Sequence, residues 1–250
     1  VLSGVITKAG VLCIIRVLYY VVGPDFVRGT WVQTALIALS LITVFMGSMM
    51  ALQTGGLKKR LAYSSVSQVS YVLFGLFMLT DLSFHGALLH VVFHSVMKNA
   101  LFLCAGAIIV KTGITEVAGL RGIGKRMPAT LWCFTLASVS LIGVPPLCGF
   151  FSKWQLAQGA IASGIPMFGW LGPVVLLVSA LLTAGYLMPI CIDGFFPGHA
   201  HGEAVAQLPP CEVGWRMLVP LIVLAALTLI LGLCPSLVEG AIASISASVL

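Results

Sequence analysis

The chain has 250 residues, of which 60% are hydrophobic and only 8% are charged, whereas soluble domains carry about 25% charged residues. This composition excludes a water-soluble domain and predicts an all-helical protein that crosses a membrane several times. The net charge of +6 does not indicate nucleic-acid binding, because the basic residues lie in two loops and within apolar segments. The seven cysteines form no CxxC pair, so neither a zinc site nor a disulfide framework is expected.

A spanning helix needs about 20 mostly apolar residues, and about seven segments of the chain meet that requirement. The opening VLSGVITKAG has no Met and no basic region before an apolar core, so it does not resemble a signal peptide and indicates the interior of a longer protein. The last dozen residues are small and apolar, which is typical of a trailing piece at the membrane interface. The expected spans cover approximately residues 2–22, 31–52, 61–79, 84–110, 129–163, 168–195 and 214–238.

The fifth expected span is too long for one crossing and contains the sequence GVPPLCGF. Pro145 and Pro146 each lack an amide donor, so the helix should unwind beside them. Unwound backbone at membrane depth is tolerated only where protein or a water-filled cavity satisfies it, and broken helices of this kind mark ion pathways in transporters. Lys153 follows this break by about two helical turns.

Two loops carry most of the basic residues that lie outside the spans. Two crossings separate these loops, so they lie on the same side of the membrane, and the positive-inside rule places both in the cytoplasm. A role as a topology signal is sufficient to explain the sequence KKR, and the opposite loops carry little basic charge beyond Arg28. His199 and His201 have no third strong metal ligand nearby, so we assign them to a solvated loop. The basic loop residues are Lys58, Lys59, Arg60, Lys111, Arg121, Lys125 and Arg126.

Several ionisable side chains fall at membrane depth, and three share one helix face, because His90, His94 and Lys98 recur every four residues. A lysine at a helix centre costs about 2.5–3.5 kcal/mol on insertion scales, so such residues normally face the bundle interior and conduct ions or protons. Desolvation disfavours the charged form of a lysine, and histidine titrates near neutral pH unaided, so both can exchange protons. Positions four apart rise about 6 Å, which fits one or two bridging waters. The candidate relay consists of Lys8, His90, His94, Lys98 and Lys153.

Each of these residues has a structural alternative. His90 and His94 could be core histidines bonded to the Ser- and Tyr-rich third span, or could ligate a metal or haem if another span supplied partners. Lys8 could extend to the interface if its helix starts earlier, and Arg16 is expected to be an anchor because arginine stays protonated. Lys98 is the hardest to explain in this way, because mainly apolar residues flank it on both sides. The polar residues of the third span, which could hold waters or join helices, are Ser64, Ser65, Ser67 and Gln68.

Three blocks of sequence, KKRLAYSSVSQVSYVLFG, HVVFHSVMKNALFLCAG and GVPPLCGFFSKW, occur in this order along the chain. Together they resemble the antiporter-like membrane subunits of respiratory complex I, of Mrp-type sodium/proton antiporters and of membrane-bound hydrogenases. The opening SGVITKAGVLCIIR also resembles the eighth spanning helix of that family. The resemblance covers nearly the whole chain, and the combination of the three blocks is highly specific.

The resemblance implies a fold of two inverted five-helix repeats, each with one broken helix, of which this chain would hold the second. The chain would then be a single membrane domain. Residues 1–30 would form a connecting helix, 31–195 the second five-helix repeat, and 196–250 a loop and the last helix. A glutamate and a lysine of the first repeat would lie upstream of Val1, so the chain is expected to be the C-terminal half of a pathway and not to translocate protons alone.

The resemblance also implies a role for each candidate residue. Lys8 matches the connecting position of the family. His90, His94 and Lys98 match the histidine and lysine stripe of the second repeat. Lys153 matches the terminal lysine that faces the outer side.

The function implied by the resemblance is proton conduction, driven by redox chemistry in partner subunits of an NADH:quinone oxidoreductase-type complex. The chain would have no catalytic centre of its own, and no quinone, flavin, iron–sulfur or metal site is identified in it. Its expected partners are other membrane subunits, protons or sodium ions, and the bilayer of a prokaryotic inner membrane. The alternatives are Mrp-type sodium/proton antiport, a subunit of a membrane-bound hydrogenase, and a membrane metalloprotein that uses His90 and His94 as ligands.

Overall fold

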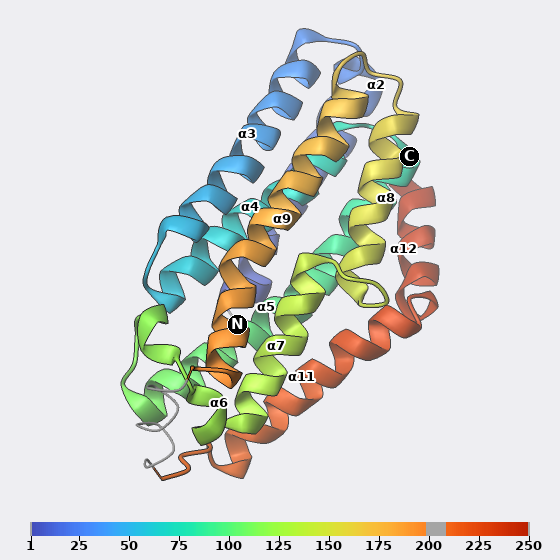
Figure 1. Cartoon of the computed structure of the whole chain (residues 1–250). Helices are drawn as coiled ribbons and strands as arrows, with labels where there is room; N and C mark the ends of the chain where they lie inside the picture. Colours follow the sequence, from blue (N-terminus) through green and yellow to red (C-terminus); the bar gives the residue numbers. More distant parts are fainter. Residues whose placement is uncertain (1, 199–208, 250) are drawn as a thin grey trace.

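A computed structural model describes residues 2–198 and 209–249 of the chain, so His199 and His201 lie outside the described residues. The described part is helical apart from its loops and one isolated bridge between Gly56 and Glu116, and the prediction of an all-helical protein is confirmed (Figure 1). The elements are η1 (Leu2–Ile6), α1 (Thr7–Ile15), η2 (Arg16–Val22), α2 (Pro24–Val27), α3 (Trp31–Gln53), α4 (Leu57–Phe77), α5 (Asp81–Thr112), η3 (Val117–Leu120), α6 (Ile123–Arg126), α7 (Pro128–Ile142), α8 (Cys148–Ala162), α9 (Phe168–Phe195), α11 (Trp215–Leu233) and α12 (Ser236–Val249).

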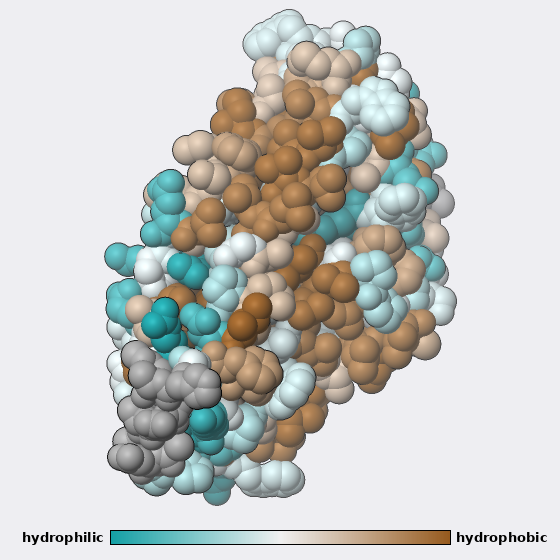
Figure 2. Space-filling model, in the orientation of Figure 1, coloured by the Kyte–Doolittle hydropathy of each residue, from teal (hydrophilic) through white to brown (hydrophobic). Residues whose placement is uncertain are grey.

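Five helices of the described part are long and apolar enough to cross a membrane. The other two expected spans are α4, which is of similar length but rich in serine, and the consecutive pair α7 and α8. Figure 2 shows apolar side chains gathered over the visible outer surfaces of α9 and α11, as contact with lipid requires. The five apolar spans are Gly4–Val22, Trp31–Gln53, Asp81–Thr112, Phe168–Phe195 and Trp215–Leu233.

The expected break in the fifth span lies between α7 and α8. The first helix ends at Ile142, and Gly143 follows with a φ of +93°, a left-handed conformation that favours glycine. The second helix begins at Cys148. The two half-helices come close together at Gly149, where a Cβ atom would collide with the carbonyl oxygen of Ser140. A hydrogen bond between Ser140 Oγ and Cys148 Sγ also joins them, at 3.2 Å.

The long helix α5 is the centre of the bundle. It packs against α4, α7, α8 and α11, and its 32 residues extend about 48 Å at 1.5 Å per residue. A hydroxyl network joins α4 to two helices on its other side, because Ser48 Oγ on α3 lies 2.9 Å from Ser67 Oγ on α4 and 2.6 Å from Ser179 Oγ on α9. Ser67 therefore joins helices, which was one of the two roles considered for the polar residues of the third span.

The two basic loops lie at the same end of the bundle, as the sequence predicted. The amide of Leu57 donates to Thr115 O and the amide of Val117 donates to Gly55 O, each at 2.9 Å. Arg60 donates to the carbonyls of Thr54 and Tyr186, so it also stabilises this end of the bundle beyond any role as a topology signal.

The last helical segments differ from the sequence expectation of one span over 214–238. The helix α11 ends at Leu233, because Pro235 has no amide donor with which to continue it. The residues that follow form α12, which packs against α5 and buries Ile242.

Candidate functional site

His90 lies at the junction of α4, α5 and α8 and is fully buried. Its Nε2 is 3.1 Å from Gln68 Oε1, which accepts a hydrogen bond when the ring hydrogen is on Nε2. Its Nδ1 is 2.9 Å from Ser152 Oγ. The Ser152 hydroxyl can donate to a neutral His90, or accept from a protonated His90 and turn its hydrogen to Gly149 O at 3.3 Å. These partners therefore accommodate both protonation states of the ring.

His94 is also fully buried, one turn along α5. Its ring stacks on that of His90, with centroids 5.8 Å apart and an angle of 13° between the rings. The Tyr71 ring also stacks with that of His90, with centroids 5.7 Å apart, and we call these three rings the ring column. Neither ring nitrogen of His94 has a hydrogen-bond partner among the described residues. Buried polar atoms are rarely left unpaired in proteins, so His94 is a polar group that requires a partner.

Lys98 continues this line one turn further and is fully buried. Its Nζ donates to Leu61 O at 3.0 Å and also to Ser64 Oγ, both on α4. Ser64 thus has a different role from Ser67, since its side chain binds the amine. Lys98 lies in the middle of α5, far from either end of this unbroken helix, which runs from Asp81 to Thr112.

Lys153 lies on α8, in the first turns after the break, and is partly buried. Its Nζ donates to Leu141 O at 2.7 Å and to Ile142 O at 3.0 Å. The last carbonyls of a helix lack intrahelical donors and carry the negative end of the helix dipole. The break therefore exposes the two acceptors that hold the Lys153 amine.

Two contacts connect Lys153 with the ring column. Its Nζ lies 5.2 Å from the centroid of the Tyr71 ring, within range of a cation–π interaction. The neighbouring residue on α8, Ser152, is the partner of His90. One turn of α8 thus contacts both the Tyr71 end of the column and its middle ring, His90.

Lys8 lies on the buried face of α1, with Val11 and Ile15, and its exposed fraction is only 5%. The helix α1 packs against α4, the helix that holds the Lys98 amine. The alternative that Lys8 extends to the membrane interface does not agree with this position. The structure therefore brings all five residues of the predicted relay to the interior of the bundle.

Three further residues of the site were not identified as such from the sequence. Tyr71 and Ser152 were not singled out, and Gln68 was considered only as a holder of water or a link between helices. The signal that was available for Ser152 is its place beside Lys153, directly after the helix break.

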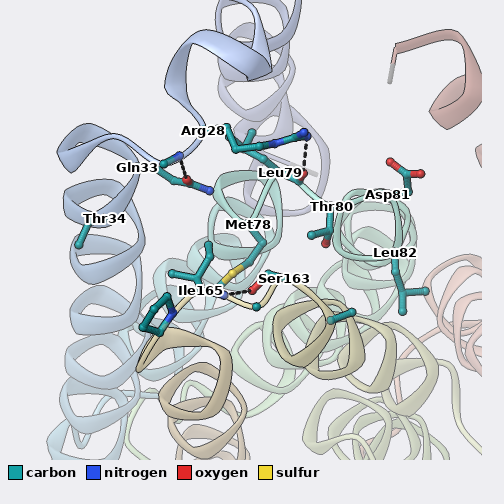
Figure 3. A pocket seen from close by; sticks show the side chains of 14 residues that line it. Arg28, Gln33, Thr34, Met78, Leu79, Thr80, Asp81, Leu82, Ser163 and Ile165 are labelled. Carbon is teal, nitrogen blue, oxygen red and sulfur yellow. Dashed lines mark hydrogen bonds between the residues drawn. The ribbon is translucent and has the colours of Figure 1, made fainter.

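A cavity of about 760 Å³ opens at the end of the bundle opposite the basic loops. The loops before α3, between α4 and α5, and after α8 line it, and Arg28 donates to Leu79 O across its mouth (Figure 3). Apolar residues of α4, α5 and α8 lie between this cavity and the turn that carries Lys153, and they include Phe74, Phe84 and Leu156, each fully buried. The packing there is close, since a Cβ at Gly75 would collide with Leu156. We call Phe74, Phe84 and Leu156 the apolar plug, because along α4, α5 and α8 they lie between the lining of the cavity and the residues of the relay.

The comparisons with known proteins agree with the fold. A family model described as NADH:quinone oxidoreductase/Mrp antiporter, TM, matches residues 1–192. The chain is 37% identical over 246 residues to an NADH-quinone oxidoreductase subunit of Desulforudis audaxviator, covering 93% of this chain and 47% of that protein. It is 34% identical over 230 residues to an Na(+)/H(+) antiporter subunit of Alkalihalophilus pseudofirmus, covering 92% of this chain and 44% of that one.

Solved structures show the same fold. A chain of the Mrp complex from a Dietzia species superposes with a TM-score of 0.85 at 24% identity, covering 99% of this chain and 52% of that chain. A chain of respiratory complex I from Thermus thermophilus superposes with a TM-score of 0.79 at 19% identity, covering 94% and 49%. The chain thus spans about half the length of the proteins that it matches.

Proposed function

The chain belongs to the NADH:quinone oxidoreductase/Mrp antiporter transmembrane family, and we propose that it carries protons as an antiporter-like subunit of a redox-driven complex of the NADH:quinone type. The observation that carries this proposal is the buried line of titratable groups from Lys98 through His94 and His90 to Lys153. The amine at the end of this line is held by the open carbonyls of a broken helix. In the proposed organisation, residues 1–30 are the connecting helix, 31–195 the second five-helix repeat and 196–250 the loop and last helix.

In the proposed mechanism a proton reaches Lys98 from the side of Lys8 and moves along the ring column. The unpaired nitrogens of His94 are the atoms that would take up bridging water between Lys98 and His90. The Ser152 hydroxyl turns as His90 changes its protonation state, so neither state leaves His90 Nδ1 without a partner. Lys153 then receives the proton beside the break and releases it toward the outer cavity when the apolar plug opens.

Coulomb coupling supplies the driving force in this proposal. At a separation of about 10 Å and an effective dielectric constant of about 20, a unit charge changes the energy of another by about 1.7 kcal/mol. That energy alters a proton-binding equilibrium by more than tenfold. Redox chemistry in partner subunits would change the charge near Lys8, and that change would act on the buried titratable groups through the low-dielectric interior. In this proposal the partners are the other membrane subunits of the complex. The complex lies in a prokaryotic cell membrane, and the positive-inside rule places the basic loops in the cytoplasm.

The proposal is tested with Lys98→Met in inverted membrane vesicles that contain the protein and its associated subunits. Proton uptake is followed with a pH-sensitive dye after addition of NADH. We expect uptake to be lost in Lys98→Met and retained in Lys58→Met, which changes an exposed lysine in the first turn of α4. Wild-type uptake in Lys98→Met would remove this residue from the pathway.

The second candidate function is sodium/proton antiport without redox chemistry, which the similarity to the Na(+)/H(+) antiporter protein of Alkalihalophilus pseudofirmus favours. The two functions differ in what starts transport. Proton movement on adding NaCl in the absence of NADH indicates antiport, whereas strict dependence on NADH indicates the redox-driven function.

The metalloprotein alternative has less support. Both ring nitrogens of His90 are in hydrogen bonds with protein side chains, and the described residues contain no group of three His, Cys, Asp or Glu residues that could hold a metal.

A further inference from the structure

The segment from Cys211 to the end of α11 contacts the broken span at two separate places. The first contact is at the start of α7. Glu212 accepts hydrogen bonds from Ala129 N at 3.0 Å, from Thr130 N at 3.4 Å and from Thr130 Oγ1 at 2.5 Å. The residue that precedes the helix, Met127, has no side-chain acceptor with which to cap it. A carboxylate from a distant part of the chain therefore supplies the missing cap.

The second contact is at the break itself. Gly232, one residue before the end of α11, faces the loop that joins α7 to α8. A Cβ at this position would lie 2.6 Å from Pro146 O, 2.7 Å from Cys148 N and 2.8 Å from Leu147 Cα. All three atoms belong to the backbone, so no side chain could rotate away to make room.

The glycine is needed here for close approach rather than for an unusual backbone conformation. Gly232 lies within α11 and does not have a positive φ, so the chain's conformation alone would allow alanine. The helix α11 ends at Leu233, directly after Gly232, so its last turn makes the contact with the loop. Figure 1 shows α11 crossing the bundle beside α7 and turning into α12 near the loop between α7 and α8.

We propose that residues 211–233 form a brace that fixes the start of α7 and the break that follows this helix, and that Gly232 is the positioning residue of the contact with the break. The loop against which Gly232 packs begins at Gly143, directly after the two carbonyls that hold Lys153. A side chain at Gly143 would meet that of Lys153, since a Cβ there would lie 3.1 Å from Lys153 Cδ. Displacing the loop would therefore move the acceptors of the amine without changing any residue that binds it. This inference rests on the proposed role of Lys153 in proton transport.

The test is Gly232→Ala in the protein purified with its associated subunits and reconstituted into proteoliposomes. Gly240→Ala is the matched control, because a Cβ at Gly240 on α12 meets nothing within 4 Å. We expect Gly232→Ala to lower the transport rate by about tenfold or more, since a misplacement of about 1 Å can reduce a positioned reaction 100-fold. We also expect its pH profile of transport to differ from that of the wild type, whereas Gly240→Ala keeps both rate and profile. A merely structural role of Gly232 would lower the yield of protein and leave the pH profile of the assembled fraction unchanged.

Lys153→Met, measured in the same series, separates this inference from the proposed function. If Lys153→Met is inactive and Gly232→Ala has wild-type rate and pH profile, the brace is wrong and the proposed function stands. If Lys153→Met transports normally, the proposed function fails whatever Gly232→Ala does. Should Gly232→Ala not assemble, Glu212→Ala decides in its place. A lowered rate with an altered pH profile in that variant supports the brace, and an unchanged rate and profile overturn it.

Discussion

Replacement of Lys153 by methionine is the perturbation that the site predicts most fully. Methionine keeps the length and packing of the side chain but cannot bind a proton. Because the proposed relay ends at this amine, we expect proton transport to fall to background, at least about tenfold below the wild type, which corresponds to about 1.4 kcal/mol in the barrier.

The stability of the protein should change much less than its transport. The substitution leaves Leu141 O and Ile142 O without the donor that they have in the structure, at a cost of about 1–3 kcal/mol each. It also removes a lysine from membrane depth, which relieves about 2.5–3.5 kcal/mol. The difference lies between about −1.5 and +3.5 kcal/mol, within the 5–15 kcal/mol by which proteins are typically stable. We therefore expect Lys153→Met to assemble.

Lys153→Arg distinguishes proton exchange from charge. Arginine keeps a positive charge and donors for the two carbonyls, but it stays protonated and cannot pass a proton on. Transport should therefore be lost in Lys153→Arg as well, and kept in Lys58→Met. The assay is dye-reported acidification of proteoliposomes, with assembly checked by native gel electrophoresis. Wild-type rates in both Lys153 variants would refute the reasoning.

Three further predictions concern the column, the break and the plug. His94→Phe keeps a stacked ring but removes the two nitrogens that would bind the bridging water; we expect the variant to assemble and to lose transport, and unchanged transport would contradict the role of the ring. Gly143→Ala places a side chain at a φ of +93°, at a cost of about 1–2 kcal/mol, and should impair transport. Gly113→Ala is the control, because its φ is +72° and its Cβ would meet no atom within 4 Å, so it should lose similar stability and transport normally. Equal transport in the two variants would argue against an effect on Lys153. Leu156→Ala opens the apolar plug, costs about 2–5 kcal/mol of stability, and should let protons leak across proteoliposomes to which no electron donor is added. A proton leak no greater than that of the wild type would show that the plug is not the barrier.

The helices and the helix break could be predicted because both depend on local sequence. Apolar runs define the spans, and Pro145 and Pro146 cannot continue a helix wherever they stand. The inward position of His90, His94 and Lys98 also followed from spacing alone, since an ionisable stripe at membrane depth must face away from lipid. The same reasoning placed Lys8 at membrane depth, and in the structure its side chain is buried against the bundle.

The partners of these groups could not be predicted, because they come from other helices. The pairing of His90 with Ser152 depends on the register between α5 and α8, which are about 60 residues apart in the chain. The carbonyls that hold Lys153 belong to main chain and have no sequence signature. The role of Glu212 could not be predicted from its place in a loop, because the free helix amides that it caps lie about 80 residues earlier, at Ala129.

The central claim is that water links the buried amines and imidazoles through the interior of the bundle. A cryo-electron microscopy map of the protein in its native assembly, at a resolution that shows ordered water, tests it most directly. The account predicts density for water at both ring nitrogens of His94, continuing toward Lys98 on one side and His90 on the other. A dry, apolar contact around His94, with the amines of Lys98 and Lys153 connected to no water at all, would contradict it.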